Sequence, residues 1–192
     1  VNVLQQAFAA SERLFLLLDL KPSYEDDKDA IEMPPIHGDI QFDHVWFAYE
    51  EENWILRDVS FTIKAGETVA FVGATGAGKT TILSLLTRNY DVQKGTIYID
   101  GIDIKKVKIQ SLRKQIGQML QDVFLFSGTI RSNISLRDDN IPNDKIEKAA
   151  FFVGANQFIE KLPLKYDEPV LEKGSNFSIG QRQLLSFART MV

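Results

Sequence analysis

Residues 73–80 read Gly-Ala-Thr-Gly-Ala-Gly-Lys-Thr, which fits the pattern G-x-x-x-x-G-K-[ST]. The five residues before this stretch, 68–72, are apolar or β-branched, as in a buried strand. The residues after it, 81–88, carry apolar side chains at helical spacing. We therefore expect a strand, a glycine-rich loop and a helix in direct succession, which is the context that a phosphate-binding P-loop requires.

The residue types in this loop suit the binding of a triphosphate. Its three glycines let the backbone approach phosphate oxygens, because no Cβ holds it away. The N–H groups at the helix start then point at the anion, together with the positive end of the helix dipole. Lys79 adds a positive charge for the β- and γ-phosphates, the Thr80 hydroxyl is a candidate Mg²⁺ ligand, and Thr81 can donate to a nearby phosphate. The predicted phosphate-binding residues are Gly73, Ala74, Thr75, Gly76, Ala77, Gly78, Lys79, Thr80 and Thr81.

The composition is that of an ordinary globular protein. The 192 residues are 44% hydrophobic and 25% charged, which suffices for one domain with a core. The net charge of −4 argues against nucleic acid as the main partner. The chain has no cysteine, which excludes disulfides and cysteine-bound metals, and no apolar run reaches the ~18 residues of a membrane span.

The first 37 residues form two segments. Residues 1–20 predict a helix with a wide apolar face. This helix either packs on the domain or is the end of a longer helix from a preceding region; the lack of an N-cap and of an initiator Met favours the second. Residues 21–37, with three prolines and an acidic run, predict a linker.

Strands and a hairpin are expected on both sides of the P-loop. Residues 39–49 and 55–63 are rich in β formers, and Asp100-Gly101 predicts a tight turn between 96–99 and 102–104. Tyr49, at the end of the first strand, is either a core or edge aromatic or a platform on which an adenine ring stacks.

The second half of the chain predicts one more strand and several helices. A strand is expected to end near Leu120, which places Gln121 where open α/β sheets hold ligand groups. Short helices are expected at 129–135, 143–153 and 157–161. Ser178 and Gln181 have the spacing of a helix capping box.

Three motifs in this order resemble the ATP-binding domain of an ABC transporter. They are the P-loop, Gln121 in L-Q-D-x-x-L-F, and F-S-I-G-Q-R-Q-L-L-S-F-A-R at 177–189. The similarity runs from about Gly38 to Val192. It implies an α/β P-loop NTPase with a RecA-like core, an N-terminal antiparallel β subdomain and an α-helical subdomain at about 122–176.

The resemblance also implies the architecture around this domain. Residues 1–20 and 21–37 resemble the end of the last transmembrane helix and the linker of a multidrug-exporter-like protein that fuses membrane and ATPase domains. Such a transporter would sit in the cell membrane with this domain on the cytoplasmic face. Its partners would be the membrane domains and a second ATP-binding domain.

The resemblance assigns roles to individual residues. Tyr49 matches the aromatic that stacks on adenine, and 73–81 match the Walker A loop that binds ATP. Lys79 and Gln121 would serve hydrolysis, and Gln121 would contact Mg²⁺, as Thr80 does, or the attacking water. Residues 168–174 look like the exporter segment that reaches the coupling helices. The signature residues that would contact the γ-phosphate of ATP on the partner's P-loop are Ser178, Gly180 and Gln181.

Two departures from the family pattern matter. Ile179 replaces a glycine of the signature, and a β-branched side chain there resists a positive φ and crowds a phosphate. We therefore expect an impaired site and favour a heterodimer over a homodimer. The sequence also ends at Val192, before the family's Walker B strand, so we expect a fold incomplete at its C-terminus that hydrolyses ATP poorly by itself.

Three functions remain open at this point. The first is the ATPase domain of an exporter whose substrate is a drug or lipid. The second is the nucleotide-binding, weakly hydrolysing half of a heterodimeric exporter. The third is a P-loop kinase or GTPase, which would leave the signature unexplained.

Overall fold

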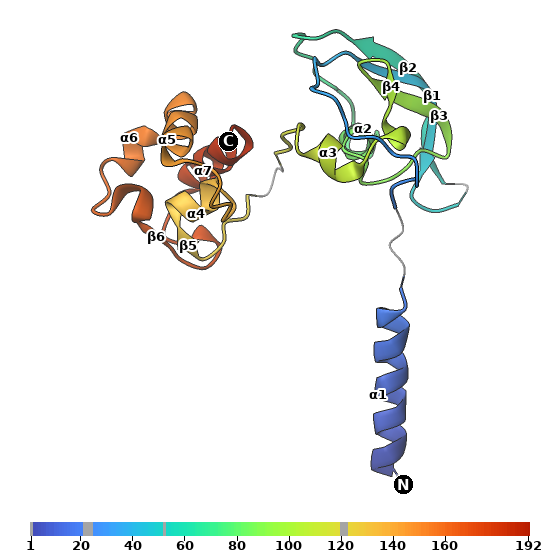
Figure 1. Cartoon of the computed structure of the whole chain (residues 1–192), viewed down its shortest axis with the longest axis horizontal. Helices are drawn as coiled ribbons and strands as arrows, with labels where there is room; N and C mark the ends of the chain where they lie inside the picture. The colour runs from blue at the N-terminus through green and yellow to red at the C-terminus, as the bar shows by residue number, and fades with distance from the viewer. Residues whose placement is uncertain (1, 21–24, 52, 120–122) are drawn as a thin grey trace. The chain divides into compact units, whose positions relative to one another are not determined.

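The computed structural model describes residues 2–20, 25–51, 53–119 and 123–192 (Figure 1). The chain divides into two compact units, Val1–Ile116 and Gly117–Val192. Each unit has its own hydrophobic core.

The first unit is built on a four-stranded antiparallel sheet with the strand order β2-β1-β3-β4. The strands predicted at 39–49, 55–63 and 96–99 are confirmed, as is the hairpin turn. Asp100 and Gly101 both have a positive φ in that turn, 51° and 78°, which an Asp-Gly pair tolerates. The four strands are β1 (Ile40–Ala48), β2 (Trp54–Ile63), β3 (Lys94–Ile99) and β4 (Ile102–Asp103).

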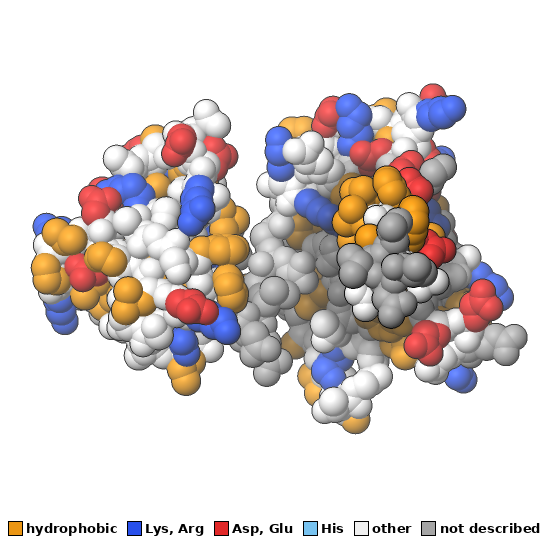
Figure 2. All heavy atoms as spheres, turned by 90° about the horizontal axis from the view of Figure 1, so that it is seen from below, with side chains coloured by type: hydrophobic (Ala, Val, Ile, Leu, Met, Phe, Trp, Pro, Cys, Tyr) orange, Lys and Arg blue, Asp and Glu red, His pale blue; other side chains and the backbone are white. Residues whose placement is uncertain are grey.

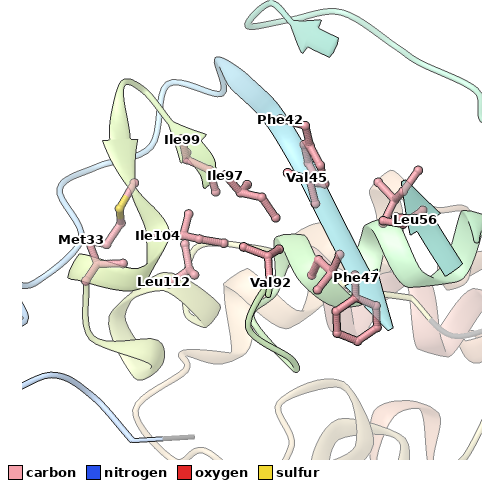
Figure 3. Packing of buried hydrophobic residues seen from close by; sticks show 13 residues of the cluster. Met33, Phe42, Val45, Phe47, Leu56, Val92, Ile97, Ile99, Ile104 and Leu112 are labelled. Atoms are coloured by element: carbon pink, nitrogen blue, oxygen red, sulfur yellow. The ribbon is translucent and has the colours of Figure 1, made fainter. Parts of the chain in front are cut away.

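Short helices cover one side of this sheet. The predicted P-loop helix is confirmed as α2 (Lys79–Leu86), and it is followed after β4 by η1 (Ile104–Lys106) and α3 (Ile109–Arg113). Residues from the sheet, from these helices and from the segment before β1 make one core (Figure 3). That core includes Met33, Phe42, Val45, Phe47, Leu56, Leu85, Val92, Ile97, Ile99, Ile104 and Leu112.

The helix predicted at the start of the chain is confirmed as α1 (Asn2–Leu18). Its apolar side chains are exposed, including Phe8, Phe15 and Leu18 at 69%, 60% and 68%, and hydrophobic side chains crowd its surface in Figure 2. Among the described residues, no helix is both long and apolar enough to cross a membrane.

The second unit is mostly helical. The helices predicted at 129–135, 143–153 and 157–161 are confirmed, and a two-stranded antiparallel ribbon, β5 with β6, lies among them. Helix α7 packs against both α4 and α5 over a core that contains Leu125, Ile134 and Leu185. The elements are β5 (Gly128–Thr129), α4 (Ile130–Ile134), α5 (Asn143–Phe152), α6 (Asn156–Ile159), η2 (Lys165–Asp167), β6 (Pro169–Val170), η3 (Glu172–Gly174) and α7 (Ile179–Thr190).

Two predicted strands are not formed. Residues 68–72, directly before the P-loop, and residues 116–119 have no regular structure. A strand exists only where a neighbour pairs with its N–H and C=O groups, and no described segment pairs with either stretch. Val72 is accordingly 94% exposed. In the described part of the chain the four-stranded sheet is antiparallel, and neither stretch adds a strand to it.

Candidate nucleotide-binding site

The glycine loop has the backbone conformation that only glycine adopts easily. Gly76 and Gly78 have φ values of 86° and 83°. A Cβ on Gly78 would lie 2.8 Å from Cδ2 of Leu56 and 3.3 Å from Cγ2 of Ile55, so strand β2 leaves no room for one. The sequence Gly76-Ala77-Gly78 therefore sets how the chain enters α2.

Lys79 is the first residue of α2 and folds back over the loop. Its Nζ donates hydrogen bonds to the carbonyl oxygens of Gly73 and Ala74, at 2.7 and 2.8 Å. Gly78 is the N-cap of α2 and has no side chain with which to cap it. A cation and the positive end of a helix dipole thus lie at the same place, which is an anion-binding arrangement.

Tyr49 lies beside the start of this helix. Its hydroxyl is 3.1 Å from Oγ1 of Thr81, a residue that is only 4% exposed. The ring is 51% exposed, and it makes edge contacts with Phe47 and Tyr90, at centroid distances of 4.9 and 5.0 Å. Tyr49 is therefore not a core residue. A half-exposed ring next to the P-loop is compatible with the prediction that an adenine ring stacks on it.

The capping box predicted in the second unit is confirmed. Ser178 is the N-cap of α7, its Oγ accepts from the backbone N–H of Gln181 at 3.2 Å, and Oε1 of Gln181 accepts from the N–H of Ser178 at 2.9 Å. A Cβ placed on Gly180 would meet nothing within 4 Å. The start of α7 is thus an ordered helix N-terminus with an open surface.

One reason given for an impaired signature is wrong. Ile179 is not among the residues with a positive φ, so this position needs no glycine conformation. Its side chain is 69% exposed at the first turn of α7. Only the steric part of the argument remains, namely that the side chain crowds a phosphate approaching this helix end.

No local sequence pattern indicates the side chain that anchors α7. Arg189 donates from Nε to the carbonyl oxygen of Asn133 at 2.9 Å and from Nη1 to that of Phe124 at 3.1 Å, and burial lowers its pKa. The amide of Asn133, which is 1% exposed, bonds both the N–H and the C=O of Phe126 at 2.8 Å. This network spans 65 residues of sequence, so no local pattern reports it. Gln121 lies outside the described residues.

The described residues do not form a metal site from protein side chains alone. The described residues contain no group of three or more His, Cys, Asp or Glu side chains that could hold one. Mg²⁺ needs few protein ligands where phosphate oxygens supply the others. A hydroxyl such as that of Thr80, one residue beyond Lys79, fits such a shared site.

The glycine loop, the uncapped helix start and the lysine above them define a P-loop nucleotide-binding protein. Residues 56–192 match the sequence family described as ABC transporter, and the chain belongs to that family. The fold class expected from the motifs is thereby confirmed.

Individual relatives agree with this assignment. The chain is 48% identical, over 191 residues, to the uncharacterized ABC transporter ATP-binding protein YknV of Bacillus subtilis (strain 168), covering 100% of this chain and 32% of that protein. It is 47% identical over 188 residues to the probable multidrug resistance ABC transporter ATP-binding/permease protein YheH of the same organism, covering 98% of this chain and 28% of YheH. The structure of a bacterial Atm1-family ABC exporter with ATP bound covers 98% of this chain and 33% of its own, with a TM-score of 0.89 and 38% identity. The chain thus spans about a third of the length of these proteins.

Proposed function

We propose that this chain is the ATP-binding part of an ABC exporter and couples ATP binding and hydrolysis to transport across a membrane. The observation that carries the proposal is the P-loop, in which Lys79 and the start of α2 converge above Gly73 and Ala74. Its relatives YheH and the Atm1-family protein are named as a permease and an exporter.

The P-loop residues account for phosphate binding. The Lys79 ammonium leaves two neutral carbonyl oxygens and moves to the β- and γ-phosphates, which carry full charges and bind it more strongly. The backbone N–H groups at the start of α2 hold the same phosphates. Thr80 and Gln121 hold Mg²⁺, which supplies positive charge that neutralises the phosphates during transfer. Tyr49 stacks on the adenine.

A second ATP-binding domain completes the site. The residues Ser178, Gly180 and Gln181 at the start of α7 contact the γ-phosphate of ATP on the partner's P-loop, because a helix N-terminus attracts an anion. Closure of the two domains moves the membrane domains, and hydrolysis resets them. This part of the transporter lies on the cytoplasmic face of the membrane.

The second candidate function is a nucleotide-binding, weakly hydrolysing half of a heterodimeric exporter. The exposed Ile179 side chain, at the N-terminus of α7, favours this second function, because a bulky side chain there opposes a close contact with a phosphate. We also expect the 192-residue chain alone to hydrolyse ATP poorly, because we assign no acidic side chain among its described residues as the general base.

The test uses the intact protein that contains this chain, reconstituted in lipid, and measures Mg²⁺-dependent ATP hydrolysis. Thr80→Val, which loses the hydroxyl but keeps the shape, is expected to lower turnover by about 100-fold. Thr80→Ser, the matched control, keeps the hydroxyl and most of the activity. Equal turnover by Thr80→Val and wild type would contradict the proposed role of the P-loop in hydrolysis.

A further inference from the structure

The segment before β1 is tied to the first unit, although its composition predicts a linker. We call residues 25–39 the strap. Ile31 forms a parallel β-bridge with Val107. The N–H of Ile31 donates to the carbonyl oxygen of Lys106 at 3.0 Å, and the N–H of Lys108 donates to the carbonyl oxygen of Ile31 at 2.8 Å. This bridge gives the strap a backbone register on the unit.

Side chains fasten the rest of the strap. Met33 is 6% exposed and belongs to the core of the first unit (Figure 3). Gln115 makes three hydrogen bonds to the strap: it donates to the carbonyl oxygens of Met33 and Pro34, at 3.0 and 3.1 Å, and accepts from the N–H of Ile36 at 2.9 Å. Asp100 accepts from the three consecutive N–H groups of residues 37–39, at 2.6, 3.0 and 2.9 Å.

Asp26, near the beginning of the strap, serves two partners. Its Oδ1 accepts a hydrogen bond of 2.8 Å from the N–H of Ile109, the first residue of α3. The N-cap of α3, Lys108, makes no side-chain cap, so Asp26 supplies that cap from 83 positions away. The same oxygen lies 3.8 Å from Nη1 of Arg88.

Arg88 is buried at the C-terminal end of the P-loop helix. It follows Thr87, the C-cap of α2, and is only 2% exposed. Its guanidinium donates to the carbonyl oxygen of Val107 at 2.9 Å and to Oδ1 of Asp91 at 3.0 Å. Arg113 in turn donates to the carbonyl oxygens of Thr87 and Arg88, at 2.9 and 2.7 Å.

We infer that Asp26 and Arg88 are positioning residues for the P-loop. The helix α2 has eight residues, so a rise of 1.5 Å per residue puts its phosphate-binding start about 12 Å from the end that Arg88 fixes. A helix this short moves as a rigid body. Arg88 is buried and is shared between Asp91 at 3.0 Å and Asp26 at 3.8 Å, so removing the Asp26 carboxylate leaves its buried charge less fully compensated. The strap is thus part of the nucleotide-binding unit, and Asp26 contacts that unit at the far end of the P-loop helix.

This inference rests on the proposed function, and nucleotide affinity tests it. In the intact protein, we would measure the Kd of a fluorescent ATP analogue at a temperature where circular dichroism shows every variant folded. Asp26→Ala removes the cap and the charge, and is expected to weaken binding about 3- to 10-fold. Asp26→Asn can still accept the hydrogen bond from the N–H of Ile109 but lacks the charge. Its Kd is therefore expected to lie between those of the wild type and Asp26→Ala.

Asp100→Asn is the matched control. It weakens the attachment of the strap at its other end, away from Arg88, and should lower the midpoint of thermal unfolding without changing the Kd. If Asp26→Ala fails to fold, Asp26→Asn carries the test. A wild-type Kd in both Asp26 variants overturns the positioning role, as does an equal weakening by Asp100→Asn. No binding by the wild type overturns the proposed function itself.

Discussion

Ile179 is the residue at which this chain departs most clearly from the family signature. Two effects are expected to impair the signature at this residue: a positive φ that a β-branched residue resists, and crowding of the phosphate by the side chain. The structure removes the first, since the φ of Ile179 is not positive, and supports the second with a side chain that is 69% exposed. The distinction changes which substitutions should relieve the impairment.

We expect Ile179→Gly and Ile179→Ala to raise ATP hydrolysis by the assembled transporter severalfold, and to similar extents, because only bulk needs to be removed. Ile179→Leu keeps the bulk and serves as the control. The measurement is the steady-state ATPase rate of the intact protein. An increase confined to the glycine variant would show that the backbone matters after all, and no increase in either would refute the crowding argument.

At His44, a local irregularity of β1 brings a histidine close to a carboxylate. In β1 its φ is 49°, and its Nδ1 lies 2.6 Å from Oδ1 of Asp58, whose own φ is 53°. The hydrogen bond to Asp58, its charge and the charge of Asp43 raise the pKa of His44 above its ordinary value of 6.5.

The sign of the linkage follows from that direction. A raised folded-state pKa gives stability that is fully present below pH 6.5 and is lost as pH rises through the folded pKa. We expect Asp58→Asn, which tolerates the positive φ, to return the pKa of His44 toward 6.5 in an NMR titration. An unchanged titration curve would mean that Asp58 does not cause the shift.

At the scale of elements, the sequence predicted those whose determinants are local. The β formers of β1 and β2, the Asp100-Gly101 turn and the glycine loop before α2 all lie within a few residues of the structure they specify. The stretch 68–72 has the same local signal but no strand, because pairing depends on a neighbour. The composition of residues 21–37 predicts a linker and does not indicate the contacts of Asp26, because these are with residues 62 and 83 positions away.

Gly95 at the start of β3 allows β1 and β3 to approach. A Cβ there would lie 2.2 Å from the carbonyl oxygen of His44, and its φ is 79°. We expect Gly95→Ala to destabilise the sheet by about 3 kcal/mol or more, since a backbone clash adds to the strain. Gly101→Ala, with a φ of 78° and nothing within 4 Å, should cost only about 1 kcal/mol.

Tryptophan fluorescence can compare the losses of stability caused by Gly95→Ala and Gly101→Ala. The chain has two tryptophans, Trp46 and Trp54, and both lie in the sheet, with ring centroids 5.5 Å apart. Denaturant unfolding followed by their emission therefore reports on the first unit. Equal losses of stability in the two alanine variants would refute the role assigned to the close approach of β1 and β3.

In the second unit, Asn133 is a single residue on which we expect the stability of α7 to depend. Asn133→Ala leaves the N–H and C=O of Phe126 without their side-chain partner and weakens the anchor of Arg189. We expect a loss of about 2 to 3 kcal/mol, measured as faster amide hydrogen exchange in α7. Asn140→Ala, at an exposed position, is the control and should change exchange little. Unchanged protection of α7 in Asn133→Ala would contradict the anchoring role.

At the scale of the whole molecule, the two parts that we propose for the ATP site lie in different units of the chain. The P-loop lies in the unit Val1–Ile116, and the signature helix α7 begins in the unit Gly117–Val192. The motifs predicted the two helix starts, because each is specified by a short local stretch. The proposal that each part serves a different ATP molecule comes from the family, and explains why one chain would need a partner.

The measurement that tests the central claim most directly is the equilibrium binding of ATP to the intact protein and to its Lys79→Ala variant. Lys64→Ala is the control, because Lys64 is exposed and its ion-pair partner is Asp39, which is not a P-loop residue. The Lys79 ammonium donates to the carbonyl oxygens of Gly73 and Ala74. Its loss should weaken ATP binding by about 100-fold, while the control variant should bind ATP as the wild type does. Wild-type affinity in the Lys79→Ala variant would show that this loop is not where the phosphates bind.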